Sequence, residues 1–242
     1  MKISTAKPAA SRWKRANLLT SLMLVFPLFL VYQVGVLAIP QVYNGADLIT
    51  SQLLHLLHGQ LAYYLLANGV LLLAFVILFL VMRRRNEFHA RMFVPVLLES
   101  AVYAVTMGSL IVFVMQNVLH VDPRLAVGPE AVGPFGKIIL SFGAGVHEEL
   151  VFRLMMIPGF AALGEKIFKL RRWVAIALAF LASAILFSAA HHIIGGEPWK
   201  LGVFTYRVLC GLIFAVIFQT RGFAVAVYTH ALYDVFVLLV QS

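Results

Sequence analysis

Charged residues are scarce in this chain. Asp, Glu, Lys and Arg make up 12% of its 242 residues, about half the share of roughly 25% in soluble domains. Hydrophobic residues reach 62%. Several stretches of about 20 residues carry no charge, which is enough to cross the ~30 Å of a bilayer's hydrocarbon core. This composition excludes a soluble globular enzyme and a disordered chain.

Cysteine is scarcer still. Cys210 is the single cysteine, which excludes an intrachain disulfide and a cluster of thiolate metal ligands. The apolar segments also lack the alternating polarity, over about 10 residues, that is typical of transmembrane β-strands. The sequence therefore predicts an all-α fold, a polytopic membrane helix bundle.

Seven apolar segments with charged or polar borders are predicted to be transmembrane helices. They are residues 17–39, 61–82, 92–119, 135–163, 173–194, 201–219 and 223–240. A loop with several Gly and Pro residues separates the third segment from the fourth. We therefore expect a basic cytoplasmic N-terminus at 1–16, a three-span region at 17–134 and a four-span region at 135–242 that carries the motifs.

The basic residues predict the orientation of these helices. Under strict alternation, 14 of the 19 Lys and Arg residues lie on one side of the membrane. Arg124, Lys137 and Lys200 lie on the other side, and two more lie inside predicted spans. Because positive loops stay in the cytoplasm, we expect a cytoplasmic N-terminus and an extracytoplasmic C-terminus. Topology thus accounts for the net charge of +9, and nucleic acid is not an expected partner.

Charged residues inside the predicted spans are costly. Each charge costs about 2.5–3.5 kcal/mol at the bilayer centre, so these side chains must face one another or a wet cavity. Those in the last four spans are Glu148, Glu149, Arg153, Arg207 and Asp234.

The segment HEELVFR, residues 147–153, places three of these charges on one helix. Glu149 and Arg153 stand one turn apart on the same face, in the favourable order, and are predicted to form a structural ion pair. Glu148 is rotated by about 100° around the helix from Glu149, so it takes no part in the ion pair with Arg153. Glu148 is therefore the expected reactive carboxylate.

Two further spans supply imidazoles. His191 follows Phe187 by one helical turn, with His192 adjacent, and His230 precedes Asp234 by one turn. A Glu and a His on adjacent helices can hold and deprotonate one water. A second His can donate a hydrogen bond to the oxyanion that forms when this water attacks a carbonyl. The combination predicts amide hydrolysis within the membrane.

Other chemistries stay open at this point. Glu148, His191 and His230 could form a three-ligand zinc site, although the HExxH pattern is absent. Metal-free catalysis without a cofactor is the preferred prediction. The spans also hold Ser141, Ser183 and Ser188, none of them in a G-x-S-x-G setting. A proton- or ion-coupled transporter and a non-catalytic membrane scaffold or immunity factor are the alternatives from other functional classes.

From residue 135 to 240 the chain resembles the CAAX-protease and bacteriocin-processing (CPBP, or Abi) family of intramembrane endopeptidases. The motif E-E-x-x-x-R is matched by Glu148, Glu149 and Arg153, F-x-x-x-H by Phe187 and His191, and H-x-x-x-N/D by His230 and Asp234. Arg207 lies in a stretch similar to the aromatic/Arg/Gly segment of the family.

The resemblance implies a role for each of these residues. Glu148 would be the general base, and His191 would help to hold its water. His230 and Asp234 would form the oxyanion site. Because an ionised carboxylate cannot donate a hydrogen bond, Asp234 would be protonated or would orient His230. The supporting residues would be Glu149, Arg153, Phe187 and Arg207, the first two of which would orient the base.

The resemblance also implies a substrate and a location. The expected partner is a membrane-associated protein or peptide, cleaved in a CAAX-like segment or at a C-terminal anchor. The expected location is the lipid bilayer of a bacterial plasma membrane.

The depths of the two histidines conflict with a shared site. At 1.5 Å per residue, His191 lies about 27 Å into its span, whereas His230 lies about 10 Å into its own. A shared site therefore requires that the fifth span is displaced or tilted, or that its start is misplaced. The fourth span, at 29 residues, must also tilt or protrude.

Overall fold

The computed structural model describes residues 18–39, 61–85, 88, 90–122, 133–193 and 198–240. Within these ranges every regular element is a helix. The helices are α1 (Leu18–Ala38), α3 (Leu61–Arg84), η1 (Ala90–Met92), α4 (Phe93–Val114), η2 (Met115–Leu119), α5 (Pro134–Glu148), η3 (Glu149–Met156), α6 (Ile157–Lys166), α7 (Arg172–Ile193), α8 (Leu201–Arg221) and α9 (Phe223–Val240). The all-α prediction is confirmed. The predicted N-terminal basic segment and most of the loop at 122–134 lie outside the described residues.

The predicted spans correspond to these helices, with ends that agree within three residues. Among the described residues, five helical stretches are long and apolar enough to cross a membrane: α1, α3, the run from η1 to η2, α7 and α8. Helix α9 is apolar but shorter. The fourth predicted span is a continuous run of α5, η3 and α6. The protein is therefore a polytopic membrane helix bundle.

Several helices begin at a proline or end at arginines. Pro134 starts α5, where its fixed φ suits a first turn and its missing N–H leaves no bond unmade. Arg83 and Arg84 end α3, and Arg221 ends α8. A cation at a helix C-terminus interacts favourably with the helix dipole.

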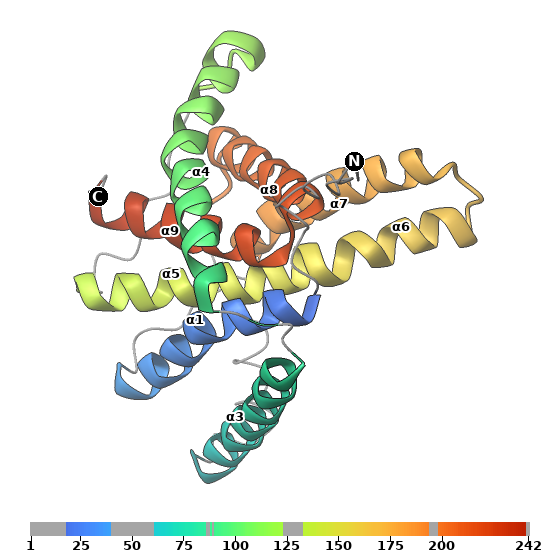
Figure 1. The fold of residues 1–242 in the computed structure, drawn as a ribbon. Coiled ribbons are helices and arrows are strands. Elements are labelled where there is room, and N and C mark those ends of the chain that lie inside the picture. The colour runs from blue at the N-terminus through green and yellow to red at the C-terminus, as the bar shows by residue number, and fades with distance from the viewer. Residues whose placement is uncertain are drawn as a thin grey trace, which may run out of the picture.

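Helix α9 lies at the centre of the bundle, in contact with α1, α4, α5 and α8 (Figure 1). One hydrophobic cluster combines buried residues of α4, α8 and α9, and a second combines α1, α5 and α9. Helices α1 and α4 thus share the core with the four-span region at 135–242. That this region is the catalytic unit stays a prediction.

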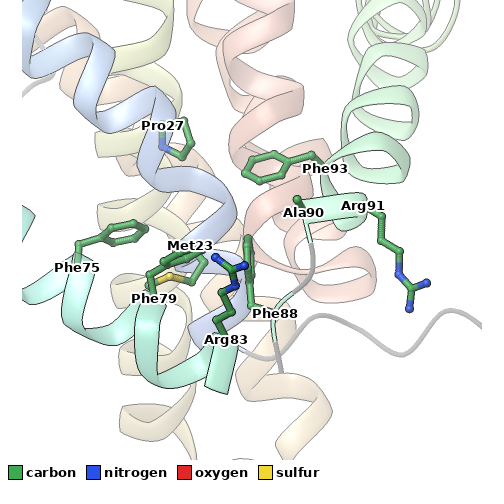
Figure 2. Close-up of a pocket in the computed structure, with 9 residues that line it drawn as sticks. All are labelled: Met23, Pro27, Phe75, Phe79, Arg83, Phe88, Ala90, Arg91 and Phe93. Carbon is green, nitrogen blue, oxygen red and sulfur yellow. The ribbon is translucent and has the colours of Figure 1, made fainter. Parts of the chain in front are cut away.

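Helix α3 packs differently from the rest. It stands beside α1, apart from the bundle (Figure 1). Only 6% of the residues in its apolar stretch are buried. The Phe75 ring of α3 stacks on Phe26 of α1, with the ring planes 8° apart. A pocket lies between α1, α3 and the start of α4 (Figure 2).

Two glycines let neighbouring helices approach closely. A Cβ on Gly145 would lie 2.9 Å from the carbonyl oxygen of Val227 and the backbone nitrogen of Ala231, so α5 and α9 almost touch there. A Cβ on Gly211 of α8 would lie 2.9 Å from Cα of Ala184 on α7. Small residues permit such contacts between membrane helices. These two crossings hold α5 against α9 and α7 against α8.

The helices cross instead of running parallel. In Figure 1, α4 runs across α5 and α9, and the run from α5 to α6 forms one long helix along the bundle. Position along a helix is therefore not depth in the bilayer. The predicted conflict between His191 and His230 does not arise in the structure, because both histidines reach Glu148.

Candidate active site

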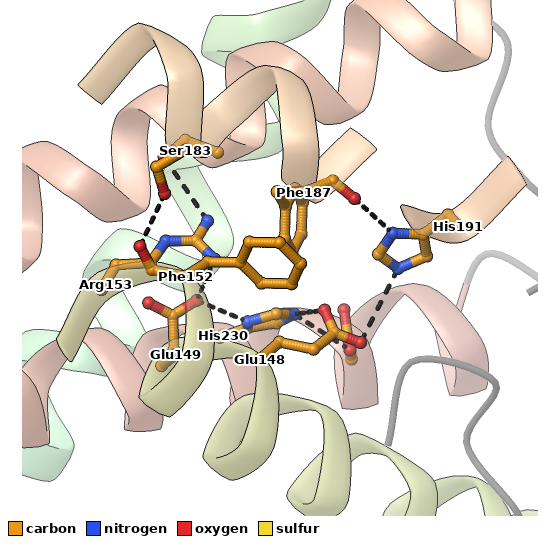
Figure 3. Close-up of polar contacts among 10 residues, drawn as sticks. Glu148, Glu149, Phe152, Arg153, Ser183, Phe187, His191 and His230 are labelled. Atoms are coloured by element: carbon orange, nitrogen blue, oxygen red, sulfur yellow. Dashed lines mark hydrogen bonds and ion pairs between the residues drawn. The ribbon is translucent and has the colours of Figure 1, made fainter. Parts of the chain in front are cut away.

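Four helical stretches contribute the side chains of the candidate site (Figure 3). The junction of α5 and η3 carries Glu148 and Glu149, α7 carries His191, and α9 carries His230. All four side chains are at least 85% buried, and Glu149 is completely so. The structure therefore brings together the acid and the two imidazoles that the sequence singled out.

Glu148 lies between the two histidines. Its Oε1 is 3.7 Å from Nε2 of His191, and its Oε2 is 3.7 Å from Nε2 of His230. Both separations exceed a direct N–H···O hydrogen bond and are short enough for one bridging water. Each oxygen of the carboxylate is thus paired with a different imidazole.

His191 is oriented by its own helix. Its Nδ1 lies 2.9 Å from the carbonyl oxygen of Phe187, one turn earlier. A carbonyl only accepts, so Nδ1 carries the hydrogen in this contact, and the lone pair of the neutral ring lies on Nε2, facing Glu148. The Phe187 ring packs edge-on against His191, with ring centroids 5.0 Å apart. Phe187 therefore positions His191 through both its backbone and its ring.

His230 is held from two sides. Its Nδ1 donates to Oε1 of Glu149 over 2.8 Å. Its ring stacks on Phe214 of α8, with centroids 4.4 Å apart and planes 17° apart. Its Nε2 also lies 3.5 Å from Oδ2 of Asp234, which is one turn away on α9. The Phe214 contact has no signal in the sequence, since nothing there distinguishes Phe214 from the other Phe residues, of which the chain has 19 in all.

Glu149 and Arg153 form the ion pair that their spacing predicts, with Nη1 of Arg153 3.2 Å from Oε1 of Glu149. Both side chains are fully buried. The guanidinium lies over the Phe187 ring at 4.4 Å and over Phe214 at 5.3 Å. Arg153 thus neutralises the carboxylate that holds His230, while the two aromatic faces also attract its charge.

The two acids occupy the junction between an α-helix and a π-helix. Glu148 is the last residue of α5, and Glu149 is the first of the π-helical η3. Helical stretches with bonds from i to i+5 are rare and are frequently found at functional sites. From the motifs, Glu149 was expected to orient Glu148 as a partner of Arg153. The contact from Glu149 to His230 was not foreseen, because it depends on where α9 lies.

The remaining candidates fall into two groups. Arg207 is half-buried on α8, within electrostatic range of Glu148 and His191, and so lies near the site. His192 lies elsewhere, stacked on Trp199 with centroids 4.4 Å apart. The structure therefore favours His191 over His192 as the partner of Glu148.

The hydroxyl groups of the three serines lie against backbone carbonyls. Ser141 donates to Lys137, Ser183 to Phe152 and Ser188 to Phe204. Among the described residues, none of the recorded hydrogen bonds joins a serine to a histidine, as a serine–histidine nucleophile requires. In the same part of the chain, no group of three or more His, Cys, Asp or Glu side chains has the arrangement of a metal site.

Comparison with known families agrees with this geometry. Residues 131–236 match the family model of the type II CAAX prenyl endopeptidase Rce1-like proteins. The match covers less than half of the chain, and over this segment the chain is similar to the Rce1-like proteins. The resemblance inferred from the motifs is thereby confirmed. No curated protein and no solved structure is detectably similar to the chain.

The Rce1-like segment begins just before α5 and ends within α9. It contains Glu148, His191, Arg207, His230 and Asp234. Together with the apolar helices, the match supports a membrane protein of the CAAX protease type.

Proposed function

We propose that this protein is an intramembrane endopeptidase in which Glu148 activates a water for attack on a peptide bond. One observation carries the proposal: the two oxygens of Glu148 each lie 3.7 Å from Nε2 of a different histidine. For a general base to activate a water, each of the two hydrogens of that water needs an acceptor in a fixed position. The burial of all three side chains excludes competing bulk water.

In this proposal the water lies between Glu148 and His191. It donates one hydrogen to the carboxylate and the other to the lone pair on Nε2 of His191. As its oxygen bonds to the carbonyl carbon, Glu148 takes the first proton. Glu148 then delivers that proton to the departing nitrogen as the C–N bond breaks. The products are a carboxylic acid and an amine, and the base is regenerated.

His230 would stabilise the tetrahedral oxyanion. For this it must carry a hydrogen on Nε2 as well as on Nδ1, so that the bond to Glu149 is kept while Nε2 donates to the oxyanion. Asp234 would then act by orienting His230 across their 3.5 Å contact, without donating a hydrogen bond itself. This role suits an ionised carboxylate, which only accepts.

The substrate class follows from the family. The matched family is that of the type II CAAX prenyl endopeptidase Rce1-like proteins, and for this chain we propose a membrane-associated protein cleaved in a C-terminal CAAX-like segment or anchor. We further propose a bacterial plasma membrane, with the N-terminus in the cytoplasm.

The test is cleavage by the purified full chain in detergent, with a prenylated CAAX peptide and a C-terminal anchor peptide as substrates. Wild type, Glu148→Gln and Glu148→Ala are compared with and without a zinc chelator. We expect chelator-resistant cleavage that both variants abolish while they purify as folded protein. Cleavage by Glu148→Gln at the wild-type rate would eliminate the proposal. Cleavage that the chelator abolishes and added zinc restores would replace it with the zinc mechanism.

A further inference from the structure

The pocket between α1, α3 and the start of α4 lies outside the candidate active site and shares no residue with it. Its volume is about 680 Å³, within the usual range of ligand pockets, about 300–1,000 Å³. Phenylalanines form much of its wall: Phe75, Phe79, Phe88 and Phe93 (Figure 2). Such a wall suits a hydrocarbon chain.

The aromatic wall is continuous from α3 to α4. Phe79 meets Phe88 edge to face, with centroids 5.6 Å apart. Phe88 meets Phe93 in the same way at 6.3 Å. Phe75 extends the row along α3, whose outer surface is apolar and almost entirely exposed. A chain in the pocket could thus enter sideways from the bilayer.

Two of the residues that line the pocket are cations. Arg83 is in the last turn of α3, and Arg91 is in η1, just before α4. Both side chains are exposed. In Figure 2 the Arg83 side chain lies beside Phe79 and Phe88, while Arg91 extends away from the aromatic rings. Between residues 83 and 91 the sequence holds four Arg and one Glu, so this segment carries a net positive charge.

The positions of these groups match an amphiphile. Helix α3 passes from an apolar span to Arg83–Arg84, which marks the boundary between hydrocarbon and head groups. A ligand with its tail among the phenylalanines would present its head group to Arg83 and Arg91. Basic pockets between membrane helices bind the head groups of anionic lipids.

We propose that this pocket binds an anionic phospholipid from the leaflet that faces Arg83 and Arg91. One acyl chain lies along the phenylalanines, and the phosphate lies at the positively charged rim, where Arg83 faces it directly and Arg91 adds to the positive charge. Because α3 makes little protein contact of its own, the lipid also joins α3 to α1 and α4. The proposal does not depend on proteolysis, since it concerns residues that the reaction does not use.

The experiment is native mass spectrometry of the delipidated full chain in detergent, titrated with phosphatidylglycerol or with phosphatidylcholine of the same acyl chains. We expect wild type to bind phosphatidylglycerol at least tenfold more tightly. Arg83→Gln/Arg91→Gln should lower that affinity by roughly thirtyfold, since each arginine near a membrane surface contributes about 1 kcal/mol and 1.4 kcal/mol is tenfold.

The matched control is Arg84→Gln/Arg85→Gln, which removes the same charge from neighbouring residues that do not line the pocket. It should change the affinity less than threefold. Ala90→Trp, which fills the pocket and keeps both cations, should also abolish the preference for phosphatidylglycerol. Its effect separates loss of the pocket from loss of charge.

Four outcomes would overturn the assignment. They are equal binding of both lipids by wild type, an equal loss in the two double variants, binding of inorganic phosphate that displaces the lipid, and competition by a prenylated peptide with the affinity of a substrate. The third result would indicate a site for free anions. The fourth would make the pocket an anchor for the substrate.

Discussion

His230 donates from Nδ1 to Oε1 of Glu149 over 2.8 Å, and this bond connects two motifs that are 81 residues apart in the chain. The same Oε1 lies 3.2 Å from Nη1 of Arg153. One carboxylate oxygen therefore holds the imidazole and the guanidinium together. Within the proposed reaction, this makes Glu149 the residue that positions His230.

Glu149→Gln should lower kcat by about 10²–10⁴ while KM stays within threefold, because the loss falls on transition-state stabilisation through His230. Steady-state kinetics on a CAAX peptide measure this split. The control is Glu165→Gln, an exposed acid on the same helical run, which should behave as wild type. A rise in KM at constant kcat would contradict a positioning role.

Substitutions of the two adjacent histidines should differ sharply in their effect on kcat. His191→Gln should lower kcat by about 10²–10⁴, the usual contribution of a group that handles a proton in the transition state. His192→Gln should change kcat less than tenfold, because His192 stacks on Trp199. Single-turnover cleavage rates of both variants give the comparison. Equal losses would show that Nε2 of His191 has no special role.

Arg153→Met should destabilise the protein by about 3–5 kcal/mol, since it leaves the fully buried Glu149 without its cation. Thermal unfolding in detergent measures the change. The double variant Glu149→Gln/Arg153→Met should recover at least half of the loss, because it removes both buried charges. If the double variant is less stable than Arg153→Met, the ion pair is not the source of the effect.

Gly145→Ala should destabilise the protein by about 1–3 kcal/mol and reduce cleavage, since overpacking a close contact has this cost. The new methyl group would lie 2.9 Å from backbone atoms of α9, which can move aside only with the helix that carries His230. Gly69→Ala is the matched control, with nothing within 4 Å of its Cβ. Unfolding temperature and kcat are measured together for both variants. Wild-type values for Gly145→Ala would mean that α9 moves away from α5 at no cost.

Much of the fold could be predicted from the residues alone. The seven spans agree with the helices within three residues because apolar length and charged borders are local properties. The pair of Glu149 and Arg153 was equally local, since one helix holds both ends. The choice of His191 over His192 also came from spacing along one helix, relative to Phe187.

The contacts between helices could not be predicted from the sequence. In parallel helices with a rise of 1.5 Å per residue, His191 and His230 would differ in depth by about 17 Å. The helices cross, and both histidines reach Glu148. Neither the bond from Glu149 to His230 nor the stacking on Phe214 has a local signature. The π-helical stretch after Glu148 was also absent from the prediction.

The amino-acid order by itself determined which segments are helical, which side chains are too polar to face lipid, and which charges share a helix face. Periodicity and hydropathy act over a few turns, so these properties need no knowledge of distant residues. The tertiary structure alone decided which imidazole faces which carboxylate oxygen. That choice depends on the angles at which α5, α7 and α9 cross, and the side chains of several distant segments set those angles together.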